Sequence, residues 1–318
     1  MTSMPRMEEL PAPPPGCRGW PWTEDSEHLP DLMPDGREWP RITVVTPSYS
    51  QAQFLEKTIR SVLLQGYPNL EYFVVDGGSA DGSVEIVRRY ERWITWWVSE
   101  RDRGQSHAIN KGFARAGGEV FAWLNSDDHY LPGALGVIGR RWRAAQKPCV
   151  LVGRGNVVDD RDGTCYEKRP GDLSFEVIRR GDGATWVLQP ACFFPAEAYR
   201  QVGGVDEELH YAMDFDLLLK LRKIVPFEVV DQCVASALFH DLGKTQAQRG
   251  RSIAEACFVQ IRHGARQEPL DTIEELVRLQ IKVIRVLNNP FCRLIMPIVR
   301  FLWRDDRRGA ATEAKKPR

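Results

Sequence analysis

Short apolar runs alternate with helical segments between residues 41 and 144, and this alternation restricts the fold more than any other feature of the chain. The runs RITVVT, LEYFVVD, TWWVSE and EVFAWLN are typical of buried strands, and the first is expected to stop at Pro47. The segments between them have helical character, with Ser50 and Asp81 as candidate N-caps. Strands and helices that alternate in this way form a parallel sheet with right-handed crossovers. The sequence therefore predicts an α/β fold in which helices flank a mostly parallel central sheet.

The pattern divides the chain into three parts. Residues 1–40 are rich in proline and predict a flexible or polyproline-like leader, although Trp20, Trp22 and Trp39 suggest that part of it packs on the body. The α/β pattern extends over residues 41–245. Residues 246–318 are helical in character and increasingly basic, so they predict a C-terminal helical appendage that ends in a disordered basic tail.

Composition narrows the class of protein and its compartment. Lys plus Arg and Asp plus Glu both total 43, so no net field draws the chain to nucleic acid or to an anionic membrane. The seven cysteines are scattered without a C-x-x-C pair, which argues against a disulfide framework and a zinc knuckle and favours a reducing compartment. No signal-peptide pattern and no run of 18 apolar residues is present, so we expect a cytoplasmic protein.

Three of the expected strands end in polar or charged residues, in VVTPSYS, FVVDGGSADGS and FAWLNSDD. Ligands of open α/β sheets bind at the carboxyl ends of the strands, so these residues predict a nucleotide site. Asp76 could accept hydrogen bonds from a base or ribose, and Gly77 and Gly78 would let a ligand approach the backbone. Asp127 and Asp128 could hold a hard divalent cation that also binds phosphate oxygens.

Each of these features also has an ordinary structural interpretation. An aspartate after a strand, such as Asp76, is most often a turn or cap residue, and the NSDD segment could be a solvated turn. The GGSADG segment only loosely resembles a glycine-rich phosphate loop. The recurrence of all three features at the same end of consecutive strands favours the binding site.

Three long segments resemble the family 2 glycosyltransferases of GT-A fold: TPSYSQAQFLEKTIRSVLLQGYPNLEYFVVDGGSADGS, SERDRGQSHAINKGFARAGGEVFAWLNSDDHYLPGAL and GGVDEELHYAMDFDLLLKL. They have the order and spacing of the family and extend over about residues 41–245. The resemblance implies a GT-A fold and transfer of a sugar, with inversion, from a UDP-, GDP- or dTDP-sugar to a glycan or lipid-linked acceptor. It also implies a Mg²⁺ or Mn²⁺ cofactor and a place in cell-surface glycan or glycolipid biosynthesis.

The same resemblance assigns roles to individual residues. Asp214 would be the general base, and Asp127, with Asp128 beside it, would bind the metal. The family often has a His near position 240 that is followed four residues on by Lys or Ser, so His240 is a third candidate metal ligand and Lys244 fits the pattern. The nucleotide-sugar pocket would be formed by Thr46, Pro47, Tyr49, Asp76, Asp102, Gly104, Asn110, Lys111, Asn125 and Ser126.

Two positions depart from the family pattern. Asn125 replaces the first acid of the D-x-D motif, which removes one negative charge, and Met213 replaces the Glu that precedes the base. Asn125 can still exchange hydrogen bonds with a ribose hydroxyl, and Asp214 is retained. Without the resemblance, Asp214 would be an acid favoured at a helix N-terminus by the macrodipole, and His240 would be a structural histidine.

Two rival functions remain open from the sequence. A metal-dependent nucleotidyltransferase would present a basic glycine-rich loop after the first strand, and TPSYSQAQ has neither glycine nor a basic residue. A nucleotide-sugar-binding protein without activity is compatible with Asn125, but Asp127 and Asp214 argue against it. Residues 268–304, with apolar residues beside Arg293, Arg300 and Arg304, suggest peripheral membrane contact or a helix that packs on the body or on a second copy.

Overall fold

The computed structural model describes residues 4–160, 163–181, 187–240, 243–267, 269–274 and 278 of the 318-residue chain. These residues belong to two compact units, one that ends at His263 and one that begins at Gly264. All of the named strands and helices lie in the first unit. Within the described ranges, no helix is long and apolar enough to cross a membrane.

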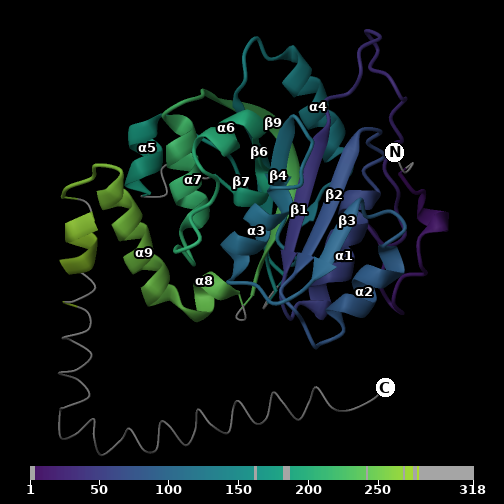
Figure 1. Cartoon of the computed structure of the whole chain (residues 1–318), viewed down its shortest axis with the longest axis horizontal. Helices are drawn as coiled ribbons and strands as arrows, with labels where there is room; N and C mark the ends of the chain where they lie inside the picture. Colours follow the sequence, from purple (N-terminus) through teal and green to yellow (C-terminus); the bar gives the residue numbers. More distant parts are fainter. Residues whose placement is uncertain are drawn as a thin grey trace, which may run out of the picture. The chain divides into compact units, whose positions relative to one another are not determined.

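The first unit is built on a nine-stranded sheet (Figure 1). Its strands are β1 Ile42–Ser48, β2 Leu70–Asp76, β3 Trp96–Ser99, β4 Val120–Trp123, β5 His129–Tyr130, β6 Val150–Asp159, β7 Cys165–Lys168, β8 Cys192–Pro195 and β9 Phe227–Phe239. Strands β3, β2, β1 and β4 lie side by side in that order and pair in parallel, as the alternation of strands and helices predicts. Because β2 and β4 flank β1 on opposite sides, the strand order reverses between β1 and β4.

The rest of the sheet is mixed in direction. Strand β8 pairs antiparallel with both β4 and β6, and β9 pairs parallel with β6 and antiparallel with β5. Strand β7 pairs only at the edge with β6, in antiparallel register. The parallel arrangement therefore covers the half of the sheet that contains β1. In the other half, the start of β8 lies toward the carboxyl end of β4, and the end of β9 lines the cavity described below.

Helices cover both faces of the sheet because successive side chains of the central strands point to opposite faces, and those on both faces are apolar and buried. On β1, Ile42 and Val44 face one hydrophobic core, and Val45 faces the other. The first core contains residues of α1 Ala52–Leu63, α2 Ser83–Tyr90 and α4 Ala134–Ala144. The second contains residues of α3 Gln105–Phe113, α5 Phe175–Arg180, α6 Ala196–Gln201, α7 Met213–Arg222 and α9 Arg249–Arg262.

Strand β1 continues two residues further than the sequence predicts. Pro47 and Ser48 still pair with Val75 and Asp76 of β2, whereas pairing with β4 ends at Val45. The backbone groups of Val45 point toward β4, and those of Pro47, two residues later, point to the same side of the strand. The N–H that Pro47 lacks would therefore lie beyond Val45 and Trp123, the last pair between β1 and β4, where no partner is needed. The strand therefore tolerates this proline, and both residues reach the sheet edge.

The N-terminal segment 4–40 packs on the body although its only regular element is the short 3-10 turn Met7–Glu9. Arg60 of α1 is fully buried and donates hydrogen bonds to the carbonyl oxygens of Pro11, Pro21 and Trp22. Trp39 is buried as well. The tryptophans thus contribute to packing, as expected from the sequence.

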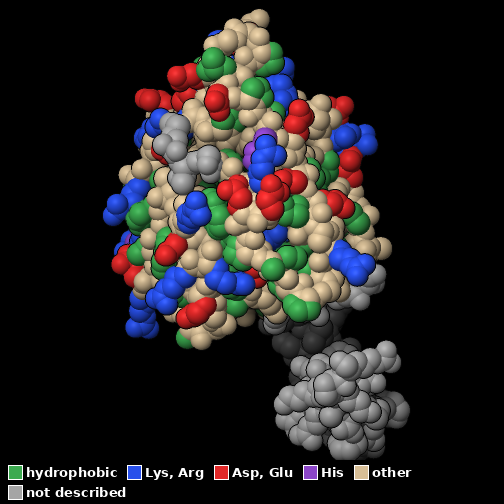
Figure 2. All heavy atoms as spheres, turned by 90° about the vertical axis from the view of Figure 1, so that its right-hand side faces the viewer, with side chains coloured by type: hydrophobic (Ala, Val, Ile, Leu, Met, Phe, Trp, Pro, Cys, Tyr) green, Lys and Arg blue, Asp and Glu red, His purple; other side chains and the backbone are tan. Residues whose placement is uncertain are grey.

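Charge is distributed without a dominant sign on the surface that Figure 2 presents, where acidic and basic side chains are intermixed. This matches the equal totals of 43 basic and 43 acidic residues.

Candidate active site

A cavity of about 860 Å³ opens at the carboxyl ends of β1 and β4, where the strand order reverses. Nine of the residues predicted for the site line it: Pro47, Tyr49, Asp102, Gly104, Asn125, Ser126, Asp127, Asp214 and His240. Five predicted residues do not line it: Thr46, Asp76, Asn110, Lys111 and Asp128. The structure thus brings together side chains from positions 47 to 240, and it separates neighbours such as Asp127 and Asp128.

One side of the cavity is formed by the ends of β1 and β2 and by the loop before α3. Tyr49 is 66% exposed, so its ring is accessible from the cavity. A Cβ atom at Gly77 would lie 2.9 Å from Asp102 Oδ2, so a larger residue there would displace the Asp102 side chain. Asp102 Oδ1 in turn accepts a hydrogen bond of 2.8 Å from the backbone N–H of Gly104.

Asp76 and Thr46 are fully buried behind this side of the cavity. The Asp76 carboxylate accepts hydrogen bonds from the backbone N–H groups of Gly78 and Ser79 and from the hydroxyls of Ser79 and Ser99. Thr46 Oγ1 accepts from the hydroxyl of Tyr72 at 3.1 Å. In this structure Asp76 therefore organises the loop that follows β2, which is the turn role that its position after a strand also allows.

Asn110 and Lys111 of α3 are engaged away from the cavity. Asn110 Nδ2 donates to the carbonyl of Val205 at 2.9 Å and to Glu207 Oε1 at 3.0 Å, and its Oδ1 accepts from the hydroxyl of Tyr199. Lys111 Nζ forms an ion pair of 3.0 Å with Glu100 Oε1. These contacts join α3 to the segment that follows α6 and to the end of β3.

The turn after β4 is held together by the side-chain amide of Asn125. Its Nδ2 donates to Asp128 Oδ2 and to Gln189 Oε1, both at 3.2 Å, and its Oδ1 accepts from Gln105 Nε2 at 2.8 Å. An aspartate has no proton to donate to either acceptor. The amide at this position is therefore complementary to its three neighbours, although the family resemblance implies an acid.

The two carboxylates of the turn have different surroundings. Asp128 is 5% exposed, and its Oδ1 accepts a hydrogen bond from the backbone N–H of Leu238 in β9. Burial, together with the negative charge of Asp127, raises the pKa of Asp128. Asp127 instead lines the cavity, where its Oδ2 lies 3.1 Å from His240 Nε2.

Asp127 and His240 are the residues that could hold a divalent cation. No group of three or more His, Cys, Asp or Glu side chains suited to a metal occurs in the described part of the chain. Mg²⁺ and related hard cations are commonly bound by one or two carboxylates, with phosphate oxygens and water as the remaining ligands. An oxygen and an imidazole nitrogen 3.1 Å apart at the cavity wall fit a cation that is completed by a diphosphate.

Asp214 lies in the first turn of α7 and also lines the cavity. Its Oδ1 accepts a hydrogen bond of 2.8 Å from the backbone N–H of Phe215. Burial raises the pKa of Asp214 despite this hydrogen bond, the carboxylate of Glu255 raises it further, and Lys244 opposes the rise. A carboxylate with a raised pKa at a cavity wall is suited to accept a proton.

Several lining residues are absent from the sequence-based predictions. Arg101 and Gln105 flank the predicted residues Asp102 and Gly104, so their proximity was a usable signal. His210 and Tyr211 precede the predicted base. Gln189 gave no such signal, because it follows the irregular segment and reaches the site only through its bonds to Asn125 and to the carbonyl of Trp123.

Comparison with known proteins gives the same family as the sequence motifs. Residues 43–199 match the family model described as glycosyl transferase family 2. An uncharacterized glycosyltransferase of Mycobacterium tuberculosis is 29% identical over 203 residues, which are 61% of this chain and 73% of that protein. An uncharacterized glycosyltransferase of Rickettsia conorii is 26% identical over 212 residues, which are 63% of this chain and 34% of that protein. The chain thus spans about a third of the length of the Rickettsia relative.

Solved structures show the fold. The mannosyltransferase PcManGT of Pyrobaculum calidifontis, in complex with GDP-Man and Mn²⁺, matches with a TM-score of 0.55 at 22% identity, over 90% of this chain and 84% of that chain. Residues 1–349 of S. aureus TarS, in complex with UDP-GlcNAc, match with a TM-score of 0.56 at 16% identity, over 69% and 66%. The architecture is that of the GT-A glycosyltransferases. Residues 43–199 of the chain belong to glycosyl transferase family 2.

Proposed function

We propose that the chain moves a sugar from a nucleotide-sugar donor to an acceptor hydroxyl, with inversion at the anomeric carbon and with the help of a divalent metal. The observation that carries this proposal is the presence in one cavity of the Asp127–His240 pair and of Asp214, whose pKa is raised by burial. The pair suits a cation, and Asp214 suits a proton acceptor. Two proteins of the same fold, solved with GDP-Man and Mn²⁺ and with UDP-GlcNAc, support a nucleotide sugar as the donor.

The donor nucleoside is assigned to the side of the cavity formed by Pro47, Tyr49 and Asp102. The accessible ring of Tyr49 offers a surface for stacking on a base, and the Asp102 carboxylate offers acceptors for hydroxyl groups. Arg101 and Lys244 also line the cavity and are placed to balance the charge of a diphosphate. Thr46, Asp76, Asn110 and Lys111 would shape this pocket from behind.

Asp127 and His240 would hold the Mg²⁺ or Mn²⁺ ion. When bound, such an ion stabilises the negative charge that develops on the leaving nucleoside diphosphate. Asn125 and Ser126 would complete the pocket beside them.

Asp214 would act as the general base. As the acceptor oxygen attacks the anomeric carbon, Asp214 takes the proton of the acceptor hydroxyl. The bond from the anomeric carbon to the phosphate oxygen breaks, and its electron pair leaves with the nucleoside diphosphate. Because attack occurs on the face opposite the leaving group, one displacement inverts the anomeric centre.

The acceptor is proposed to be a glycan or a lipid-linked sugar in cell-surface glycan or glycolipid biosynthesis at the cytoplasmic side of the membrane. The Arg293, Arg300 and Arg304 region, which suggested membrane contact or a dimer, lies outside the described residues. Both forms of association remain predictions.

The test is a measurement of nucleoside diphosphate release from a panel of UDP-, GDP- and dTDP-sugars, with water and with glycan and lipid-linked acceptors. We expect release with at least one donor in the presence of Mn²⁺ and loss of release with EDTA. Anomeric analysis of the product by NMR would show inversion.

Other outcomes would favour the rivals. Formation of pyrophosphate from a nucleoside triphosphate and a sugar phosphate would identify a nucleotidyltransferase. Binding of a nucleotide sugar without release of nucleoside diphosphate across the acceptor panel would identify a binding protein without activity. Release that is insensitive to EDTA would contradict the metal role.

A further inference from the structure

Glu255 of α9 holds the backbone that leads into the proposed base. Its Oε1 accepts a hydrogen bond of 2.8 Å from the N–H of His210, and its Oε2 accepts from the N–H of Tyr211 and, at 2.6 Å, from that of Ala212. Helix α9 lies beyond residues 43–199, the segment that matches the family model. A single side chain, 43 to 45 residues further along the chain, therefore binds three successive N–H groups.

These three residues immediately precede the first turn of α7, which contains Asp214. Ala212 is the N-cap residue of α7 and provides no side-chain cap, so Glu255 satisfies its N–H from another helix. His210 and Tyr211 also line the cavity. Movement of Glu255 would therefore disturb both the cavity wall and the residue proposed to take the proton.

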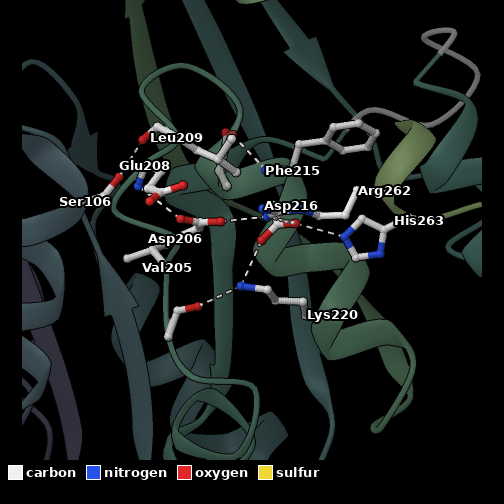
Figure 3. A network of polar contacts seen from close by, with 12 residues as sticks. Ser106, Val205, Asp206, Glu208, Leu209, Phe215, Asp216, Lys220, Arg262 and His263 are labelled. Carbon is white, nitrogen blue, oxygen red and sulfur yellow. Dashed lines mark hydrogen bonds and ion pairs between the residues drawn. The ribbon is translucent and has the colours of Figure 1, made fainter. Parts of the chain in front are cut away.

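The same segment is anchored on its other side by α3. Ser106 Oγ donates a hydrogen bond of 3.0 Å to the carbonyl of Leu209, as Figure 3 shows. Ser106 directly follows Gln105, which lines the cavity. The segment 209–212 is thus held between the helix beside the donor pocket and α9.

The charge of Glu255 also acts on the base. Asp214 interacts electrostatically with groups of three elements. The charges of Glu255 in α9 and of Lys244 in α8 Lys244–Ala247 shift the pKa of Asp214, and the charge of Asp214 raises the pKa of the Cys192 thiol in β8. The pKa of Asp214 is raised by burial, and Glu255 contributes to the rise. Removal of this negative charge would make Asp214 a weaker base.

We infer that Glu255 is a positioning residue for the transfer reaction: it fixes the 210–212 backbone, and through it the place of Asp214 at the cavity. The inference rests on the proposed function for its catalytic consequence. Its structural part, the anchoring of three N–H groups by one carboxylate, can be measured without turnover.

The test compares Glu255→Gln with Arg262→Gln in the full-length protein. Arg262 is on the same helix and forms ion pairs with Asp206, at 2.6 Å, and with Asp216, at 3.5 Å (Figure 3), and its side-chain hydrogen bonds in the described structure go to these two carboxylates. The control variant therefore removes the ion pairs of α9 with Asp206 and Asp216 and leaves the hydrogen bonds of Glu255 in place. Glutamine is similar in size to glutamate, but its NH₂ group cannot accept a hydrogen bond.

Amide hydrogen exchange provides the first measurement. In Glu255→Gln, we expect the protection of at least one of the His210, Tyr211 and Ala212 amides to fall about tenfold or more, since the glutamine NH₂ group cannot accept from the N–H that faces it. Arg262→Gln should leave these three amides unchanged. Equal protection in wild type and Glu255→Gln would overturn the inference whether or not the protein transfers sugar.

Nucleoside diphosphate release from the donor found active in the panel provides the second measurement. We expect kcat of Glu255→Gln to fall about tenfold with little change in the donor KM, because the base and not the donor pocket is displaced. The acidic limb of its pH profile should also move to lower pH, whereas Arg262→Gln should keep the wild-type limb. An unchanged kcat and limb in Glu255→Gln would refute the positioning role, while the absence of turnover in wild type would refute the proposed function alone.

Discussion

The turn after β4 and the first turn of α7 each contain two closely spaced aspartates, and in each pair one carboxylate lines the cavity. Asp127 and Asp214 are the lining residues, whereas Asp128 and Asp216 are buried. The buried members differ in their partners. Asp128 accepts hydrogen bonds from the Leu238 N–H and the Asn125 amide, which are both neutral. Asp216 is surrounded instead by Lys220, Arg262 and His263 (Figure 3).

This difference in partners separates the pKa values of the two buried acids. Burial raises the pKa of Asp128, and the charge of Asp127 adds to the effect. Burial also acts on Asp216, but hydrogen bonds from His263 and Lys220 outweigh it and lower the pKa of Asp216 to about 2. The charge of Asp216 is thus neutralised within the helix turn, which is consistent with the proposed role of Asp214 as the base. In the strand turn, Asp128 receives hydrogen bonds from neutral donors only, so the proposed function assigns the balance of the negative charge there to a cation bound in the cavity.

The largest expected effect belongs to Asp214→Asn. We expect kcat for nucleoside diphosphate release to fall about 10²- to 10⁴-fold with little change in stability, because the general base is lost while the shape of the side chain is kept. In wild type, Asp214 must be deprotonated, so activity should fall as pH decreases through its pKa, which lies above the ordinary value of 3.8. This acidic limb should be absent from the variant. A variant with wild-type kcat would contradict the role of Asp214.

Asp127→Asn and Asp128→Asn form a matched pair at adjacent positions. We expect Asp127→Asn to lower Mn²⁺-dependent turnover about 10²- to 10³-fold, since a metal contributes several kcal/mol to charge stabilisation in the transition state. Asp128→Asn should change turnover far less, because Asp128 does not line the cavity and its carboxylate is already costly to bury. Titration with Mn²⁺ would show the difference, and equal losses in the two variants would mean that both carboxylates bind the metal.

The sequence contains enough information to predict the parallel half of the sheet and the strand ends that meet at the cavity. Apolar runs, helical spacing and turn residues act over short distances, so β1, β2 and β4 and the position of Asp127 follow from local patterns. The antiparallel pairing of β8 between β4 and β6 does not follow in this way. It depends on contacts between segments that lie far apart in the chain.

The orientation of individual side chains was the least predictable part of the site. Asp127 and Asp128 are equivalent by spacing, and one of the contacts that hold Asp128 away from the cavity comes from Leu238, 110 residues later. Asp76 is withdrawn from the cavity by hydroxyl and N–H donors of its own loop and of β3. Glu255 could not be recognised at all, because its partners are backbone groups that carry no sequence signal.

Asp216→Asn tests the neutralised turn of α7. We expect the free energy of unfolding to fall by about 3 kcal/mol, because Lys220 and His263 lose a charged buried partner. Because the pKa of Asp216 is lowered from 3.8 to about 2, the stability that its charge contributes is present above pH 3.8 and is lost as the pH falls toward about 2. This pKa shift corresponds to about 2 kcal/mol of the free energy of unfolding. Urea denaturation of wild type and Asp216→Asn between these pH values should therefore show that the difference between their free energies of unfolding becomes smaller as the pH falls. A difference that increased or stayed constant as the pH fell would contradict the ion pairs of Asp216 with Lys220 and His263.

Asn125→Asp tests the role of the uncharged Asn125 amide in the turn after β4. Of the substitutions proposed here, we expect it to have the smallest effect on the protein. The new carboxylate cannot donate to Asp128 or Gln189 and adds a third acid beside Asp127, so we expect a loss of about 1–3 kcal/mol in the free energy of unfolding. Asn125→Ala removes the same hydrogen bonds without the added charge and should be less destabilised. Because a third acid strengthens a cation site, Mn²⁺ should raise the melting temperature of Asn125→Asp more than that of wild type or Asn125→Ala. If Mn²⁺ stabilised all three proteins equally, Asn125 would lie outside the reach of the cation, and its amide would serve only to bind Asp128, Gln189 and Gln105.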